Sequence, residues 1–191
     1  TLVGEPSTSS ITASRDQSNL AVINHLANWL EGLKFAVTVL PLPNKGGKAN
    51  LIATLGNGEG GLVLSGHTDT VPCDENHWDT DPYTLTEIDS VVHGLGSCDM
   101  KGFFPIALEA ASLFHSKKLN KPLTILATSD EESSMAGVRQ LLRDGRPKAD
   151  FAIIGEPTGL QPIIAHKGVL ALSIVIEGSG GHASNPNLGC N

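Results

Sequence analysis

The sequence predicts an α/β fold, a mostly parallel sheet flanked by helices, followed by the start of a second domain of the α+β class. Strand-like and helix-like segments alternate along most of the chain, which is typical of parallel strands joined by helical crossovers. Residues 61–64, 123–127 and 151–154 are almost continuously apolar, as expected of parallel strands buried on both faces. After Glu156 the pattern changes to β-rich and Gly/Ser-rich segments, which indicates a second domain.

The first expected helix covers residues 18–31. Its apolar residues recur at spacings of three and four: Leu20, Ile23, Ala27 and Leu30. Ser18 is the expected N-cap and Gly32 the expected C-terminal stop.

The remaining elements are expected in the following order. They are strands over 35–40 and 50–55, a strand ending near His67, a short strand at 83–86 within the long loop 71–98, a buried helix over 103–114, a strand over 123–128, a helix through Leu142 capped by Ser133 or Ser134, and a strand over 151–154. The segments 163–165 and 170–176 are also β-rich.

Composition excludes several classes of protein. The chain has 191 residues, 40% of them hydrophobic, and a net charge of −7 without a basic stripe, which argues against nucleic acid and anionic membranes as partners. No apolar run has the length of a membrane span, and no signal-peptide pattern opens the sequence. The three cysteines, Cys73, Cys98 and Cys190, lack CxxC spacing and fit a reducing compartment, so we expect a cytoplasmic protein.

The ends of the sequence lead us to expect a fragment. The chain starts at Thr1 without Met and stops shortly after a new Gly/Ser-rich motif. We expect residues 1–168 to form a metal-binding catalytic domain and residues 169–191 to begin a truncated lid or dimerisation domain. The alternating strand-like residues Leu172, Ile174 and Ile176 should then lie exposed or pair with another molecule, because one strand forms no stable sheet.

Groups that can bind a metal follow the predicted strands or a glycine bend. His67 follows 61–66, Asp99 follows Gly94-Leu95-Gly96, the pair Glu131-Glu132 follows 123–130, and Glu156 follows 150–155. The carboxyl ends of parallel strands meet at one edge of a sheet, so these groups should converge there. Several carboxylates with one imidazole form the ligand set of a two-metal hydrolase, and a spare carboxylate can act as a base.

Each of these residues also has a purely structural explanation. His67 alone is more often a hydrogen-bonded histidine at a strand end, and Asp99 alone could cap the helix that follows it. Asp69, however, lies two residues beyond His67, where it can accept the imidazole N–H as metal-bound histidines require. The adjacent carboxylates of Glu131 and Glu132 repel each other unless a cation is present or one is protonated.

Four blocks carry a family resemblance: Ser65-Gly66-His67-Thr68-Asp69-Thr70-Val71-Pro72, Gly94-Leu95-Gly96-Ser97-Cys98-Asp99-Met100-Lys101-Gly102, Asp130-Glu131-Glu132 and Gly155-Glu156-Pro157-Thr158. They resemble the signature blocks of the co-catalytic zinc amidohydrolases, a family that includes aminoacylases, succinyl-diaminopimelate desuccinylase and carboxypeptidase G. The resemblance covers essentially the whole chain, with the blocks in the family's order. It implies a zinc-peptidase-like catalytic domain that is incomplete in this chain.

The resemblance also implies a role for each site residue. Two zinc ions, which cobalt can replace, would be bound by four residues: Asp99 would bridge both ions, His67 and Glu156 would complete one site, and Glu132 would bind the other ion. Glu131 would be the general base, and Asp69 would orient His67. His182 would reach the site of a neighbouring subunit. It further implies a cis peptide between Asp99 and Met100. The family's last zinc-binding histidine has no counterpart here, so we expect at most one tight metal site and little activity in this chain alone.

The implied activity is hydrolysis of the N-acetyl amide of N2-acetyl-L-ornithine to acetate and L-ornithine, a step of arginine biosynthesis. A desuccinylase or another N-acyl amino acid hydrolase of the family is one alternative, and a non-catalytic metal-binding remnant is another. The expected partners are a small N-acyl amino acid and, at full length, a second copy of the protein.

Overall fold

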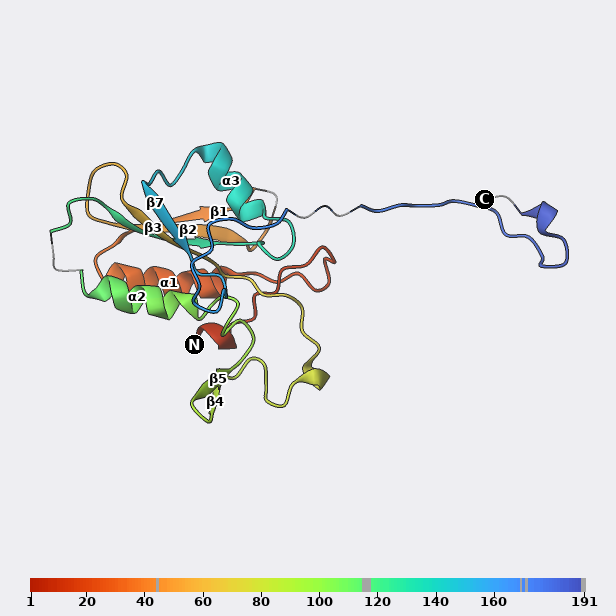
Figure 1. Cartoon of the computed structure of the whole chain (residues 1–191), viewed down its shortest axis with the longest axis horizontal. Helices are drawn as coiled ribbons and strands as arrows, with labels where there is room; N and C mark the ends of the chain where they lie inside the picture. Colours follow the sequence, from red (N-terminus) through yellow and green to blue (C-terminus); the bar gives the residue numbers. More distant parts are fainter. Residues whose placement is uncertain (44, 115–117, 169, 171, 190–191) are drawn as a thin grey trace. The chain divides into compact units, whose positions relative to one another are not determined.

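The computed structural model describes residues 1–43, 45–114, 118–168, 170 and 172–189 (Figure 1). The chain forms two compact units, Thr1–Pro157 and Thr158–Asn191. The first contains every α-helix and β-strand of the described residues, and the second contains a single 3-10 turn, η3 (Pro186–Leu188). The division of the sequence into a catalytic domain 1–168 and a lid domain 169–191 stays a prediction.

The first unit is built on a five-stranded sheet with the order β1-β2-β6-β3-β7. Its strands are β1 (Ala36–Pro41), β2 (Ala49–Leu55), β3 (Leu62–His67), β6 (Leu123–Thr128) and β7 (Phe151–Ile154). β3 lies between β6 and β7 and is parallel to both, whereas β2 pairs antiparallel with β1 and with β6. The α/β class and the parallel direction of the three predicted strands are confirmed, and β1 and β2 add an antiparallel edge. The predicted burial of 151–154 on both faces was wrong, because β7 lies at the other edge of the sheet and its residues are exposed.

Helices cover both faces of this sheet (Figure 1). α1 (Leu20–Gly32) and α2 (Phe103–Ser112) lie on one face, and α3 (Ala136–Asp144) lies on the other. The larger core joins residues of α1 and α2 to β2 and β6, among them Ile23, Phe104 and Leu51, and the smaller core joins Leu141 of α3 to Val63 of β3. Each fully buried side chain of this size contributes roughly 1.5–3 kcal/mol, so the two cores hold the sheet rigidly beneath the strand ends.

A short hairpin replaces the strand predicted at 83–86. β4 (Thr86–Ile88) pairs antiparallel with β5 (Val91–His93), and Tyr83 lies in a turn instead. The carboxylate of Asp81 accepts the N–H of Tyr83 at 2.9 Å and the hydroxyl of Thr84 at 2.8 Å. These local bonds favour a turn over an extended strand, which is why the prediction was wrong in this place.

Two predicted helix caps were also wrong. The N-cap of α1 is Asn19, whose side chain bonds the backbone of Ala49 in β2, while the hydroxyl of Ser18 accepts the N–H of Leu20 at 3.1 Å. The N-cap of α3 is Met135 in the left-handed conformation, not Ser133 or Ser134. At α1 the hydrogen bonds between Asn19 and Ala49 are a tertiary contact at the start of the helix.

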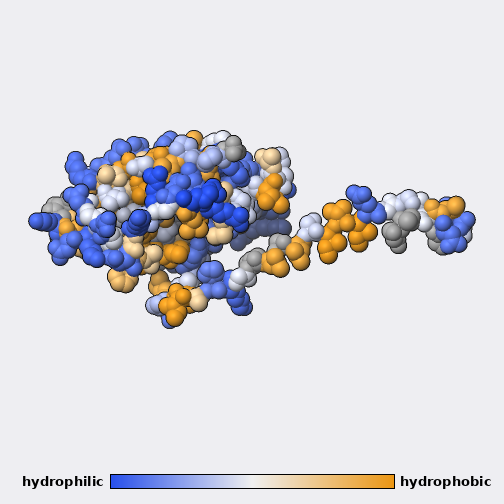
Figure 2. Space-filling model, turned by 90° about the horizontal axis from the view of Figure 1, so that it is seen from above, coloured by the Kyte–Doolittle hydropathy of each residue, from blue (hydrophilic) through white to orange (hydrophobic). Residues whose placement is uncertain are grey.

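The second unit contains none of the predicted strands in residues 163–165, 170 and 172–176. Its apolar residues are exposed as predicted, with Leu172 at 78%, Ile174 at 83% and Ile176 at 81% (Figure 2). A strand needs hydrogen-bonding neighbours, and this segment has no ladder partner among the described residues.

Two predictions from composition can be compared with the structure only in part. Cys73 and Cys98 are free thiols, and Cys190 lies outside the described residues. Within the described ranges, the helices are all too short or too polar to cross a membrane.

Candidate metal centre

The predicted site residues meet at one edge of the sheet because three parallel strands end there. His67 is the last residue of β3 and lies opposite Thr128, the last residue of β6, which leads to Glu131 and Glu132. Glu156 follows β7 by two residues. Asp99 comes from the loop that precedes α2. All of these residues belong to the first unit.

The first group of possible ligands consists of His67, Asp99 and Glu156. Nε2 of His67 lies 3.0 Å from Oδ1 of Asp99 and 3.8 Å from Oε1 of Glu156, and one ligand atom of each residue lies within 4.8 Å of the others. The imidazole is 2% exposed, whereas the two carboxylate side chains are 49% and 40% exposed. The histidine therefore forms the floor of a site whose carboxylates face solvent, and the predicted convergence of these three residues is confirmed.

A second group consists of His67, Glu131 and Glu132, whose ligand atoms also lie within 4.8 Å of one another. Both glutamates therefore approach the imidazole, and proximity alone does not separate a ligand from a base. Nδ1 of His67 already bonds a main-chain carbonyl, so Nε2 is the ring nitrogen that can bind a metal. Nε2 can bind one ion of a pair. The division of labour between Glu131 and Glu132 stays a prediction.

Asp69 holds His67 in a different way from the one predicted. Nδ1–H of His67 donates to the main-chain carbonyl of Asp69 at 2.9 Å, and the nearer carboxylate oxygen, Oδ1, lies 3.7 Å away. This bond puts the proton on Nδ1 and leaves Nε2 free to face the carboxylates. The carboxylate instead accepts the N–H of Glu132 through Oδ2 at 3.1 Å. Asp69 thus joins the end of β3 to the loop of the two glutamates.

The loop before α2 contains further buried groups. The peptide between Asp99 and Met100 is cis, as the family resemblance implies. The next residue, Lys101, is 2% exposed, and its Nζ donates to the carbonyls of Leu2 at 3.2 Å and Glu5 at 2.8 Å. Burial lowers the pKa of Lys101 to about 8. Sequence reasoning assigned Lys101 no role, although it directly follows the Asp99-Met100 pair.

The electrostatics of the site favour a bound cation. Burial, with the negative charge of Asp99, raises the pKa of Glu132 to about 7, and burial with the charges of Asp99 and Glu131 raises the pKa of Glu156. Burial lowers the pKa of His67, but the carboxylates of Asp69 and Glu156 outweigh it and the pKa is raised. Oδ1 of Asp69 is buried without a hydrogen-bond partner among the described residues. Crowded carboxylates around one imidazole fit a divalent ion such as zinc.

We expect the affinity of the metal-free protein for Zn²⁺ to fall as the pH drops through about 7. In the predicted division of labour Glu132 is a ligand and must lose its proton to bind metal, and its pKa of about 7 makes the proton compete below that value. Its ordinary pKa is 4.5, so the folded metal-free state binds this proton more tightly than the unfolded chain, and stability should decrease as the pH rises from 4.5 towards 7. Chelator competition between about pH 6 and about pH 8 measures the affinity; a flat profile would contradict this assignment.

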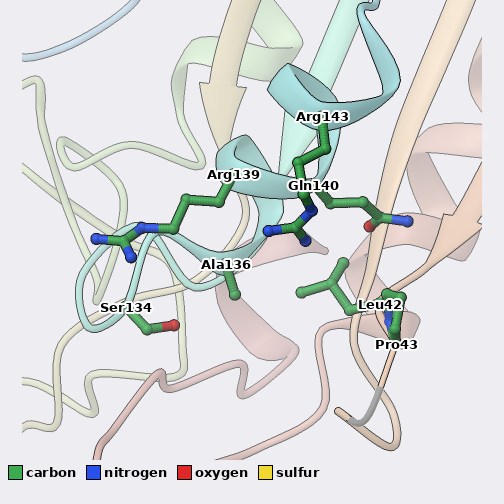
Figure 3. A pocket seen from close by; sticks show the side chains of 7 residues that line it. All are labelled: Leu42, Pro43, Ser134, Ala136, Arg139, Gln140 and Arg143. Atoms are coloured by element: carbon green, nitrogen blue, oxygen red, sulfur yellow. The ribbon is translucent and has the colours of Figure 1, made fainter.

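Two cavities lie near this edge of the molecule. The larger, of about 450 Å³, is bounded by Asp99 and Glu132 and also by Trp78 and His93, so it lies directly beside the predicted metal ligands. The smaller, of about 230 Å³, lies beside α3, where the side chain of Arg143 points towards Leu42 and that of Arg139 extends towards the side of Ser134 (Figure 3). None of the predicted metal ligands lines this smaller cavity.

His182 belongs to the second unit and is exposed. Its Nδ1 accepts the N–H of Ser184 at 3.2 Å and lies 2.7 Å from the Ser184 hydroxyl. Its role at the site of a neighbouring subunit stays a prediction.

Comparison with known proteins agrees with this geometry. Residues 63–183, which include every predicted site residue, match the profile of the peptidase family M20/M25/M40. The chain belongs to this family. Its signature blocks are therefore those of the M20 metal-dependent hydrolases, as the sequence analysis predicted.

Two curated relatives of the chain come from bacteria. The chain is 54% identical over 190 residues to acetylornithine deacetylase of Proteus mirabilis and 52% identical over 190 residues to that of Photorhabdus laumondii. These matches cover 100% of this chain and 49% of each relative. The chain spans about half the length of the curated relatives it matches.

Solved structures share the fold. Human carnosine dipeptidase 1 is 25% identical with a TM-score of 0.66, over 80% of this chain and 36% of that one. The M20 family metallo-carboxypeptidase Sso-CP2 of Sulfolobus solfataricus is 22% identical with a TM-score of 0.64, over 81% of this chain and 35% of that one. The chain thus shares the fold of part of an M20 enzyme.

Proposed function

We propose that the full-length protein hydrolyses the N-acetyl amide of N2-acetyl-L-ornithine to acetate and L-ornithine, and so serves arginine biosynthesis in the cytoplasm. The observation that carries the proposal is the convergence of His67, Asp99 and Glu156 with the Glu131-Glu132 pair at one edge of the sheet. The substrate is suggested by relatives that are about half identical to this chain and named acetylornithine deacetylase.

We infer that the site uses two zinc ions, with cobalt as a substitute. His67, Asp99 and Glu156 would hold one ion, and Glu132 together with Asp99 would hold the other, which requires one further ligand from outside this chain. Bound zinc supplies a water of lowered pKa and a Lewis acid for the carbonyl oxygen. Several carboxylates and one nitrogen within 4.8 Å of one another suit this ion.

In this proposal the chain's own residues divide the proton chemistry. Glu131 takes a proton from the attacking water and returns it to the leaving amine, since a carboxylate beside the ligands can serve as both base and acid. Asp69 keeps Nε2 of His67 turned towards the ligands through its carbonyl. In the full-length homodimer, His182 of one subunit would stabilise the oxyanion in the site of the other.

The deciding experiment compares substrates with the purified full-length protein. We expect zinc-dependent release of acetate from N2-acetyl-L-ornithine at a kcat/KM at least about tenfold higher than for N-succinyl-diaminopimelate, since one extra or missing contact is worth roughly 10–200-fold. A reversed preference would assign the protein to the desuccinylases. No hydrolysis of any N-acyl amino acid by a zinc-loaded, folded protein would identify a non-catalytic metal-binding protein instead.

A further inference from the structure

The loop that carries Glu131 and Glu132 begins at Asp130, a charged residue whose side chain is 0% exposed. Its φ of 57° lies in the left-handed region, which is uncommon for a residue other than glycine. Its carbonyl accepts the N–H of Ser134 at 3.2 Å and of Met135 at 2.6 Å. Asp130 therefore closes the loop on itself, and any rotation of Asp130 would displace both glutamates.

Two lysines hold the carboxylate of Asp130 from different sides. Nζ of Lys48 lies 2.9 Å from Oδ1, and Nζ of Lys45 lies 2.8 Å from Oδ2. Lys48 is 2% exposed and directly precedes β2, whereas Lys45 is 34% exposed. Nζ of Lys48 also lies 2.9 Å from Oδ1 of Asp16. Two ammonium groups thus face two carboxylates, beneath a site that is otherwise acidic.

Stability does not explain this arrangement. Removing water from buried charges offsets most of their mutual attraction, so a buried ion pair adds little to the net stability of a fold. Its clearest effect is on conformation, because leaving either partner alone in the interior is strongly unfavourable. The lysines therefore restrict Asp130 to a position in which both of its oxygens are paired.

The rest of the loop is fixed at its two ends. The side chain of Asn50 in β2 accepts the N–H of Ser129 at 3.1 Å and donates to the carbonyl of Gly137 at 3.0 Å. A Cβ on Gly137 would collide with Asn50 and with the backbone of Ser129, so the loop closes tightly at this point. On the other side, Asp69 accepts the N–H of Glu132. Glu131 and Glu132 lie between these fixed contacts, and Asp130 makes the charged contact at the start of the loop.

We propose that Asp130, held by Lys45 and Lys48, is a positioning residue that sets where Glu131 and Glu132 face the metal ligands. Asp130 belongs to neither group of possible ligands in the described chain, so it acts through the loop. The proposal rests on the proposed function in that Glu131 is the base and Glu132 a ligand. It assigns a role to Asp130, the first acidic residue of the block Asp130-Glu131-Glu132, for which the family resemblance implied no role.

The test compares Asp130→Asn with Asp16→Asn in the full-length protein. Both changes remove a carboxylate charge 2.9 Å from Nζ of Lys48, but only Asp130 belongs to the glutamate loop. We expect Asp130→Asn to lower kcat per bound zinc by at least about tenfold with KM within about twofold, because a displacement near 1 Å can cost about 100-fold. Its affinity for Zn²⁺, measured by chelator competition on the metal-free protein, should also fall. Asp16→Asn should match the wild type in both measurements.

A purely structural role predicts a different result. If Asp130→Asn lowered only the thermal midpoint, with wild-type kcat per bound zinc and wild-type Zn²⁺ affinity, the positioning role would be wrong. If Asp130→Asn failed to fold, Lys45→Met would decide, since Lys45 is partly exposed. A loss of kcat per bound zinc and of Zn²⁺ affinity, smaller than that expected for Asp130→Asn, would support the proposal. Wild-type values of both quantities would overturn it. If the wild type hydrolysed no N-acyl amino acid, the proposed function would fail, and the Zn²⁺ affinities of the variants alone would still test the positioning role.

Discussion

Replacing Glu131 by Gln is expected to lower kcat by about 10²–10⁴-fold while the zinc content stays at the wild-type value. The amide keeps the size of the side chain and its place in the loop but cannot accept a proton. Replacing the adjacent Glu132 by Gln should instead lower the zinc content, because an amide oxygen is a weaker ligand than a carboxylate. The two variants are matched, since they make the same chemical change at neighbouring positions of one loop.

Steady-state kinetics and elemental analysis of both variants measure this division of labour. These measurements can contradict the predicted roles, because ligand atoms of both glutamates lie within 4.8 Å of one on His67. Equal loss of zinc in the two variants would show that both are ligands and that the base lies elsewhere. Loss of zinc in Glu131→Gln alone would exchange the two roles.

Replacing Asp99 by Asn is expected to weaken Zn²⁺ binding by more than about 100-fold, since changing the outer partners of a metal ligand already costs about 10–100-fold. Oδ1 of Asp99 lies 3.0 Å from Nε2 of His67, at the centre of the first ligand group, and its proposed role is to bridge two ions. Isothermal titration of the metal-free full-length protein measures the affinity and the number of sites.

Asp74→Asn is the control for this variant. Asp74 lies between β3 and β4 and belongs to neither group of possible ligands among the described residues. Its side chain is 58% exposed, and its carboxylate accepts the N–H of Asn76. This variant should bind zinc like the wild type. A wild-type number of tight zinc sites in Asp99→Asn would remove the bridging role.

Much of the fold could be predicted from the order of apolar residues. Continuous apolar runs indicated β3, β6 and β7 as parallel strands, although the edge strand β7 is exposed rather than buried, and spacings of three and four indicated α1. The errors had different causes: local hydrogen bonds of Asp81 form a turn at Tyr83, and the distant contact between Asn19 and Ala49 shifts the start of α1. Leu172, Ile174 and Ile176 alternate like a strand, yet no neighbour in the described chain pairs with them.

The candidate site was likewise determined in part by the sequence and in part by the tertiary structure. The sequence by itself determined which groups follow the strands at the carboxyl edge, because a side chain's place after an apolar run is a local property: His67, the two glutamates and Glu156. The glycine bend before Asp99 likewise indicated that residue. Only the tertiary structure decided that Asp69 holds His67 through its carbonyl and Glu132 through its carboxylate. It alone also brought Lys48 to Asp130. Hydrogen bonds and ion pairs depend on distances of about 3 Å, and such distances between segments far apart in sequence are set by the packing of the elements that carry them.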